Sequence, residues 1–368
     1  MEILFLTRFN PRDIHEWSGI FYNMCQKLKE KNHVEIMGAE ILGQIALYSR
    51  RNFPNGFFLP EYRYEKKLGR LLSERINGTS CELILFGDLL LQPLDIHVPF
   101  LHCSDLTYEL VKIHYAKSDE RSIETFIELE KLALSSAYRI IYCTEWLKNR
   151  VAEIYDIDPN KIDVVEFGAN IPAPTKYSID IQMDICRLVF IGVDWERKGG
   201  DIVLQTYQPL KNEGFPCTLT IIGSTPKYTP EYDPDLTIIP FLDKNREDHL
   251  QKLNDILYES HFLVLPTQFD AFGIVFCEAS AYGIPSIATN VGGVGQPVRE
   301  GKNGFLLPPD ATAQDYAEKI KTVFSDRESY IKLRASSRHE YETRLNWDVW
   351  GERVNAIFED AVKEWKSR

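Results

Sequence analysis

The chain has 368 residues, of which 44% are hydrophobic and 26% are charged, and it includes 18 Tyr and 20 Phe. This length and this supply of large apolar side chains favour two folded domains and exclude disorder on the scale of a domain. The 54 acidic residues outnumber the 42 basic ones, and the resulting net charge of -12 argues against a nucleic-acid partner, whose phosphates would have to be neutralised.

Short apolar runs rich in β-branched residues alternate with longer helical stretches through the first half of the chain. We expect strands at residues 2–8, 33–39, 82–88, 98–104, 138–144 and 161–168. Because continuous apolar strands between helices are buried on both faces, this series predicts a parallel sheet with helices on either side. The next segment, residues 169–185, holds two prolines and no strong periodicity, so we expect it to link two domains.

A second series of the same design follows the linker. Its expected strands cover residues 186–193, 218–224, 236–242, 261–267, 285–290 and 304–309, and residues 337–368 read as helix, with Trp347 and Trp350 suited to packing. The two series predict an α/β protein in which two Rossmann-like, doubly wound parallel-sheet domains face each other across a cleft. We place these domains at residues 1–172 and 173–345, and we expect residues 346–368 to pack back on the first domain. Ligands of such sheets bind beyond the carboxyl ends of the strands, so the loops after those ends are the candidate sites.

Two candidate residues of the first half lie in such positions. Ser18 could cap the helix after the first strand, and Gly19 would let backbone approach a phosphate at that helix N-terminus; the alternative is a plain turn. His102 ends a strand and could hydrogen-bond a sugar hydroxyl or a developing charge, against the alternative of a packed or surface histidine.

Two cations and two acids are the candidates of the second half. Arg197 and Lys198 follow the first strand of this half and precede two glycines and a helix. There they can neutralise a diphosphate leaving group, aided by the helix dipole; the alternative is a solvated basic turn. Asp270 and Glu278 follow a later strand and have seven residues between them. A carboxylate in that position can accept two hydrogen bonds from a ribose diol, while the alternative for Glu278 is a solvated place on an amphipathic helix.

These stretches resemble glycosyltransferase family 4, a retaining family with the two-domain GT-B fold and a Glu-x7-Glu motif. The motif corresponds to Asp270-AFGIVFC-Glu278, and the likeness continues through FIGVDWERKGGD, EASAYGIPSIATNVGG and CTEWLKNRVAEIYDIDPNKIDVVEFGAN. The resemblance covers most of the chain and is strongest from Tyr138 to Pro308. It implies the GT-B fold and a nucleotide-sugar donor.

The resemblance also implies a role for each candidate. Glu278 would bind the nucleotide ribose, Asp270 the donor sugar and Lys198 the phosphates. The family's glycine-rich N-terminal loop is similar to the WSGI segment that contains Gly19, and its strand-end histidine matches His102. We expect the catalytic residues to be His102, Asp270, Arg197 and Lys198. We expect the donor-binding residues to be Gly19, Arg197, Lys198, Asp270, Phe272, Gly273, Ile274 and Glu278.

Three positions depart from the family pattern. The first acid of the motif is Asp270, which is one methylene shorter than Glu. Val193 stands where the family has an arginine, and we expect Arg197 to supply that charge from the other side of the turn. Gly295-Gln296 replace the usual Pro-Glu.

The cysteines and the lengths of the apolar runs indicate the cellular compartment in which we expect the protein. Seven cysteines are scattered without a C-x-x-C pair, which favours reduced thiols over disulfides or a zinc site. The N-terminal apolar run is too short for a signal peptide, and no later run approaches the roughly 20 residues that cross a bilayer. Residues 53–72 mix aromatic and basic side chains and would suit a lipid-linked acceptor; the alternative is an irregular connection with a solvated helix face. We expect a cytoplasmic protein that could associate peripherally with the inner face of a membrane.

The expected activity is that of a retaining hexosyltransferase. It would move a sugar from a nucleotide diphosphate, a UDP- or GDP-sugar, to a glycan, lipid-linked or small-molecule acceptor, as in polysaccharide biosynthesis. No Asp-x-Asp motif is placed after a strand, so we expect neither a metal nor a cofactor. Two alternatives stay open: a nucleotide-sugar hydrolase, epimerase or phosphorylase on the same fold, and a catalytically silent nucleotide-binding subunit.

Overall fold

The structure is a computed structural model, and it describes residues 1–7, 9–38, 70, 73–87, 95–114, 120–174, 177, 179, 181–226 and 233–368. The chain divides into two compact units. Unit 1 comprises Met1–Val165 and Trp350–Arg368, and unit 2 comprises Glu166–Val349. The chain therefore passes twice from one unit to the other, after Val165 and after Val349.

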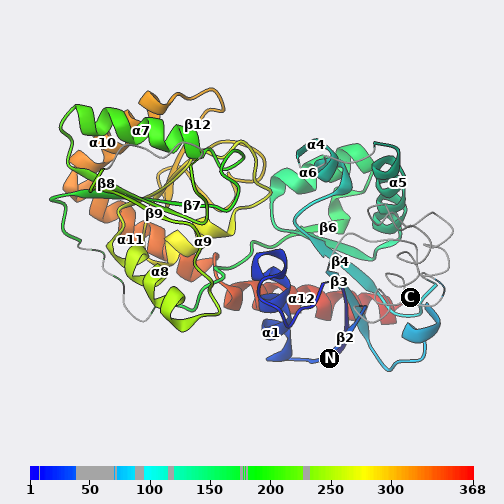
Figure 1. The fold of residues 1–368 in the computed structure, drawn as a ribbon. Helices are drawn as coiled ribbons and strands as arrows, with labels where there is room; N and C mark the ends of the chain where they lie inside the picture. The colour runs from blue at the N-terminus through cyan, green and yellow to red at the C-terminus, as the bar shows by residue number, and fades with distance from the viewer. Residues whose placement is uncertain are drawn as a thin grey trace, which may run out of the picture. The chain divides into compact units, whose positions relative to one another are not determined.

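Unit 1 is built on a six-stranded parallel sheet in the order β2-β1-β3-β4-β5-β6 (Figure 1). The central strands β3 and β4 are buried along their whole length, which explains why their sequences are continuous apolar runs rather than alternating ones. The strands are β1 (Glu2–Leu6), β2 (His33–Met37), β3 (Leu83–Gly87), β4 (Phe100–Ser104), β5 (Arg139–Tyr142) and β6 (Ile162–Val164).

Helices cover both faces of this sheet. They are η1 (Glu16–Gly19), α1 (Ile20–Lys29), α4 (Tyr108–His114), α5 (Glu120–Ser136), α6 (Glu145–Tyr155), η2 (Pro159–Lys161) and α12 (Trp347–Lys366). Figure 1 shows α1 and α12 on one face and α4, α5 and α6 on the other. Asn32 Nδ2, just beyond α1, donates to Asn355 Oδ1 of α12 at 2.7 Å, and the Trp350 side chain is fully buried. The last helix is thus part of the core of unit 1.

Unit 2 repeats the design with a parallel sheet in the order β12-β11-β10-β7-β8-β9. Its strands are β7 (Cys186–Ile191), β8 (Cys217–Ile222), β9 (Leu236–Ile239), β10 (Phe262–Leu265), β11 (Ser286–Thr289) and β12 (Gly304–Leu307). β10 and β11 are buried at every residue. All the expected strands are present in the two sheets, so the expectation of two doubly wound parallel sheets is confirmed.

The helices of unit 2 also lie on both faces of their sheet. They are α7 (Gly200–Asn212), α8 (Glu247–Glu259), α9 (Ile274–Ala281), α10 (Ala313–Ser325) and α11 (Arg327–Thr343). Figure 1 shows α7 and α10 on one face and α8, α9 and α11 on the other. Across the described ranges of both units, no helix has the length and apolar character needed to span a membrane.

The C-terminal tail differs from the single helical stretch expected for residues 337–368. Helix α11 ends at Thr343 and α12 begins at Trp347. The break is stabilised locally, because Asn346 Oδ1 accepts a hydrogen bond from Val349 N at 3.0 Å and so caps α12. The side-chain cap, rather than helix propensity, decides where the last helix starts.

Candidate functional site

The strand order of unit 2 reverses at β7, which pairs with β8 on one side and β10 on the other. The loops after β7 and β10 therefore leave the same edge of the sheet as neighbours, at the position where doubly wound sheets bind ligands. The two loops are bonded together: Gln268 N and Thr267 Oγ1 donate to the carbonyl oxygen of Arg197, at 2.7 and 3.1 Å. This junction brings the cations of one loop to the acid of the other.

Two glycines make the junction possible. Gly199 has a φ of +77°, and a Cβ built on it would lie 1.9 Å from the carbonyl oxygen of Pro266. A Cβ on Gly192 would lie 2.9 Å from Cγ of Lys198, so the lysine stem lies directly over this glycine. Only residues without a side chain allow these approaches, which explains the glycines around the Arg197-Lys198 pair.

The cations chosen from the sequence gather around Asp270. Lys198 Nζ donates to both carboxylate oxygens of Asp270, at 2.6 and 2.9 Å. Arg197 Nη1 donates to the Phe269 carbonyl at 3.0 Å and lies 3.4 Å from Asp270 Oδ1, while Arg197 Nε donates to Asp194 at 3.1 Å. The Asp270 side chain is 8% exposed and that of Lys198 13%. The structure thus brings Arg197 and Lys198 together around the buried carboxylate of Asp270 in one charge cluster.

Glu278 lies apart from that cluster, on α9. The residue is 1% exposed, so the expected alternative of a solvated glutamate on an amphipathic helix is wrong. Its Oε1 atom accepts a hydrogen bond from Lys244 Nζ. Lys244 was not among the residues expected from the sequence, although it follows the carboxyl end of β9, where ligands of parallel sheets bind.

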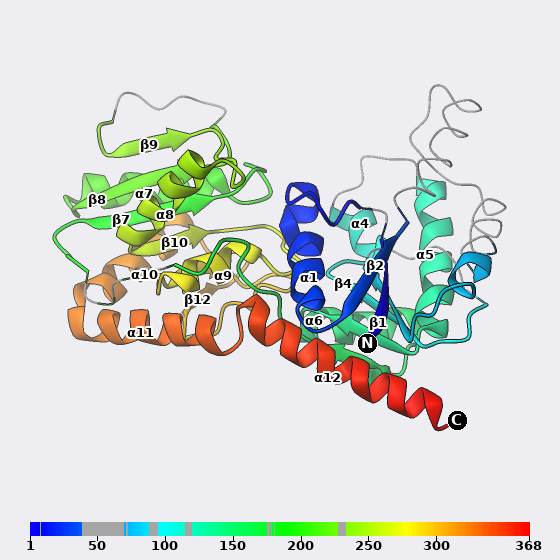
Figure 2. The ribbon, with the colours of Figure 1, turned by 90° about the horizontal axis from the view of Figure 1, so that it is seen from below.

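Helix α9 is anchored at its C-terminal end by α11, which lies beside it (Figure 2). Arg334, fully buried, donates to the carbonyls of Ser260 and Tyr282 at 3.0 and 3.1 Å. Arg338 donates to the carbonyl of Ala281. Two guanidinium groups thereby satisfy the last carbonyls of α9 and stabilise the negative end of its dipole.

The first turn of α9 is more accessible. Gly273 is the N-cap residue with a φ of +89°, and both Gly273 and Ile274 are half-buried. Phe272 is buried, and its ring meets that of Phe167 at a centroid distance of 5.6 Å. Their assignment to donor binding stays a prediction, and the geometry leaves backbone N–H groups of this turn near the protein surface.

In unit 1, Gly19 is the N-cap of α1 and has a φ of +85°. The expectation that Ser18 caps this helix is wrong, because Ser18 itself lies in the left-handed region with a φ of +56° and no side-chain cap bond forms. Trp17 is also left-handed, with a φ of +50°. Its indole Nε1 donates to Asp105 Oδ1 at 3.0 Å, which ties this strained turn to the end of β4.

His102 lies on β4 with no exposed surface. Burial lowers the pKa of its imidazole to about 3, so the ring is neutral at physiological pH. Neither ring nitrogen has a hydrogen-bond partner among the residues that the structure describes, and the Tyr142 ring packs edge-on at 5.9 Å. Burying a neutral imidazole with both nitrogens unpaired lowers the stability of the fold, so a function for His102 is a reasonable explanation for its retention in this position.

The structure also shows the surroundings of the positions that differ from the pattern of glycosyltransferase family 4. Val193, which corresponds to an arginine in that pattern, is 72% exposed. Arg197 meets the cluster instead through the contacts described above. Gln296 Nε2 donates to the buried carboxylate of Glu166 at 2.8 Å. Residues 53–72, apart from Arg70, lie outside the described residues.

Comparison with curated proteins relates the chain to known glycosyltransferases. Residues 186–326 match the family model described as Glycosyl transferases group 1. The chain is 24% identical over 274 residues to the D-inositol 3-phosphate glycosyltransferase of Rhodococcus erythropolis, covering 68% of this chain and 60% of that protein. It is 25% identical over 256 residues to the capsular polysaccharide biosynthesis glycosyltransferase CapM of Staphylococcus aureus, covering 64% of this chain and 65% of that protein. The chain thus spans about 60% of the length of the curated relatives it matches.

Solved structures share the fold over nearly the whole chain. Anabaena Alr3699/HepE in complex with UDP has a TM-score of 0.68 at 15% identity, covering 98% of this chain and 100% of that one. WaaG, a glycosyltransferase involved in lipopolysaccharide biosynthesis, has a TM-score of 0.63 at 12% identity, covering 96% and 99%. These neighbours confirm the GT-B fold, and the family model with the curated relatives confirms the resemblance to glycosyltransferases of the family 4 type.

Proposed function

We propose that this protein is a retaining glycosyltransferase that transfers a hexose from a nucleotide diphosphate donor to an acceptor. The observation that carries the proposal is the cluster at the switch point of unit 2, where Lys198 and Arg197 surround Asp270. Two adjacent cations on the loop after β7 suit a diphosphate, and the acid that the neighbouring loop places among them suits the hydroxyls of the sugar that it carries. The family match of residues 186–326 supports the same conclusion.

The cations would act on the leaving group. As the bond between the sugar and the diphosphate breaks, negative charge grows on the diphosphate, and Arg197 and Lys198 stabilise that charge. The N-terminus of α7, which begins at Gly200 directly after them, adds a partial positive charge. This arrangement needs no metal ion for the electrostatic task, so we propose a metal-independent enzyme without a cofactor.

The two acids would hold different parts of the donor. Glu278 would accept hydrogen bonds from the ribose diol, and Asp270 would orient sugar hydroxyls. His102 would serve as a neutral hydrogen-bonding group, because its lowered pKa excludes a charged imidazolium at neutral pH. Gly19, Phe272, Gly273 and Ile274 would contribute backbone N–H groups to the donor.

For the donor we propose a UDP-sugar first and a GDP-sugar second. The support for UDP is the neighbour Anabaena Alr3699/HepE, which was solved in complex with UDP and glucose. We propose a glycan, lipid-linked or small-molecule acceptor in polysaccharide biosynthesis, with CapM as the supporting relative. The proposed location is the cytoplasm, with peripheral contact to the inner face of the membrane for a lipid-linked acceptor.

Thermal unfolding in the presence of UDP, GDP and ADP tests the proposal. A ligand at 100 times its dissociation constant adds about 2.7 kcal/mol of stability, which is readily measured. The nucleotide that stabilises the protein is then offered as its glucose conjugate, with and without candidate acceptors. Sugar release without an acceptor would indicate a hydrolase, release that needs phosphate would indicate a phosphorylase, and binding without turnover would indicate a silent subunit. No stabilisation by any of the three nucleotides would contradict the proposal.

A further inference from the structure

The carboxylate of Glu278 is buried beside a single cation. Its side chain is 2% exposed, whereas that of its partner Lys244 is 30% exposed. No other described residue bonds this carboxylate, so its negative charge is compensated by Lys244 alone within that part of the chain. A charge this deeply buried needs such a partner, because leaving it unpaired would be far more costly than the contact itself is worth.

The loop that carries Lys244 is held in a defined turn. Asp243 N donates to His249 Nδ1 at 3.0 Å, and Asn245 N donates to Asp243 Oδ1 at 2.9 Å. Arg246 N donates to the carbonyl of Asp243 at 3.0 Å. These bonds fix the backbone on both sides of Lys244 and anchor it to α8, so the ammonium is presented to Glu278 by a preformed turn.

A ribose that binds Glu278 could change its ion pair with Lys244 in two ways. It can displace the ammonium, which would leave a buried carboxylate with only neutral hydroxyls around it. Alternatively it can share the carboxylate, because two oxygens offer about four acceptor positions and Lys244 takes one of them. Sharing keeps the ion pair intact and is favoured by the burial of Glu278.

Sharing also brings the other donors of Lys244 to the nucleoside. An ammonium has three N–H donors, and one of them is used on Glu278; the others have no partner among the residues described by the structure. A ribose hydroxyl can donate to the carboxylate and accept from the ammonium at the same time. The pair therefore offers one acceptor and one donor to a single hydroxyl.

We propose that Lys244 is a specificity-determining residue that, together with Glu278, recognises a ribose hydroxyl of the donor nucleotide. This inference rests on the proposed function, since it assumes that Glu278 faces the nucleoside. It predicts that the protein discriminates ribonucleotides from deoxyribonucleotides and that this discrimination depends on the ammonium of Lys244. A residue that served only to stabilise the fold would not change the preference for one hydroxyl.

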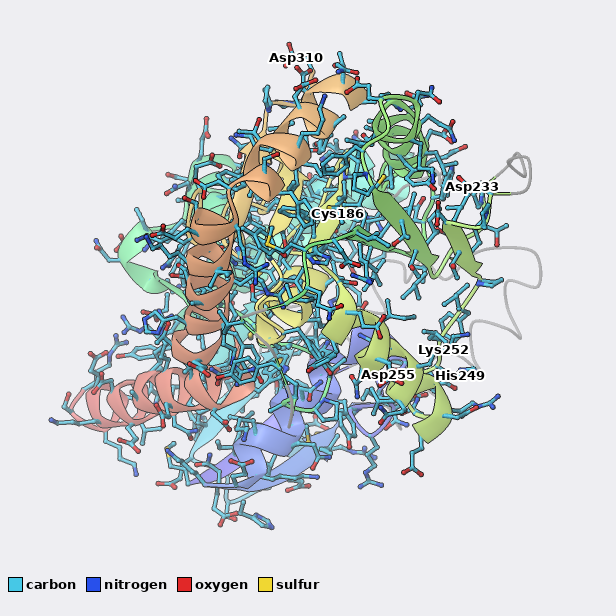
Figure 3. The ribbon with its side chains drawn as sticks, turned by 90° about the vertical axis from the view of Figure 1, so that its left-hand side faces the viewer. Cys186, Asp233, His249, Lys252, Asp255 and Asp310 are labelled. Carbon is cyan, nitrogen blue, oxygen red and sulfur yellow. The ribbon has the colours of Figure 1, made fainter. Side chains whose placement is uncertain are left out.

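The test compares ligands and variants in one set of measurements. Dissociation constants are measured by calorimetry for UDP, 2′-deoxy-UDP and 3′-deoxy-UDP, and likewise for the GDP and ADP series. The variants are Lys244→Met, which keeps the stem and removes the charge, and Lys244→Arg, which retains a cationic donor. The matched control is Lys252→Met, the same change at an exposed lysine of α8, drawn with His249 and Asp255 in Figure 3.

We expect the unmodified protein to bind one deoxy analogue at least tenfold more weakly than the ribonucleotide. Lys244→Met should reduce that ratio to less than threefold, Lys244→Arg should retain most of it, and Lys252→Met should leave it unchanged. If Lys244→Met binds every nucleotide more weakly but keeps the full ratio, or binds as the unmodified protein does, the inference is overturned while the proposed function stands. If no nucleoside diphosphate binds the unmodified protein, the proposed function itself fails. Thermal unfolding of each variant without ligand identifies a loss of folding.

Discussion

Replacing Asp270 by Asn should tighten the binding of diphosphate while lowering sugar transfer. Both oxygens of Asp270 accept from Lys198 Nζ, at 2.6 and 2.9 Å, and Arg197 Nη1 lies 3.4 Å away. A diphosphate that enters the cluster therefore meets cations that are already neutralised and a carboxylate that repels it. Asparagine keeps the shape and removes the repulsion.

The size of the effect follows from these distances. A phosphate oxygen on the far side of the ammonium, as far from Nζ as the carboxylate oxygens are, would lie about 5.5 Å from Asp270. At an effective dielectric constant of about 20, two unit charges at that separation repel by about 3 kcal/mol. Salt screens part of this repulsion, so we expect inorganic diphosphate to bind about tenfold tighter, a change of about 1.4 kcal/mol.

Calorimetry with inorganic diphosphate and with UDP measures this change, and product formation from the UDP-sugar is followed in parallel. The control is Asp194→Asn, which makes the same substitution at a 48% exposed carboxylate that also bonds Arg197. Exposed ion pairs contribute little, so this variant should change affinity by less than threefold. Weaker diphosphate binding by Asp270→Asn at low salt would refute the idea that the acid competes with the ligand, and unchanged transfer would remove Asp270 from the reaction.

Three further predictions concern single residues. Glu278→Gln should weaken UDP binding at least tenfold and leave inorganic diphosphate binding unchanged, because hydrogen bonds to a charged acceptor contribute about 1.5 to 3 kcal/mol each; equal weakening for both ligands in calorimetry would contradict the ribose assignment. Gly199→Ala should lower the free energy of unfolding by at least about 2 kcal/mol through strain and the clash with Pro266, whereas Gly214→Ala, with a similar φ of +74° and no atom within 4 Å of the added Cβ, isolates the backbone strain in the same urea titration. Equal losses in the two glycine variants would show that the contact with Pro266 is unimportant. Burial lowers the pKa of His261 to about 4, so the histidine contributes stability that is full above pH 6.5 and is lost as the pH falls from there toward 4. Between pH 7 and pH 5 this loss should amount to about 2 kcal/mol in unfolding measurements, and His261→Gln should remove it; the same pH dependence in that variant would rule out His261 as its source.

Much of the fold could be predicted from the sequence because its signals are local. A strand buried on both faces is a continuous apolar run. A run such as FLVL in β10 can therefore be recognised from its own sequence, without knowledge of the strands that pair with it. The positions of Arg197, Lys198, Asp270 and Glu278 after strands were equally visible, since strand ends are marked by the end of the apolar run. The sequence therefore determined the parallel sheets, their order along the chain and the loops that could bind a ligand.

Contacts between loops were decided by the tertiary structure alone. Lys198 meets Asp270 because strands β7 and β10 pair side by side and because Gly199 lets their loops touch at Pro266. Lys244 meets Glu278 because α9 and the loop after β9 converge. Nothing in the sequence of either segment predicts that the two side chains form a pair. Helix ends followed the same rule: Ser18 fails as a cap because its backbone is left-handed, and Asn346 starts the last helix with a bond to Val349. An ion pair or a cap depends on distances of a few ångströms between atoms, and those distances are set only when the whole domain has packed.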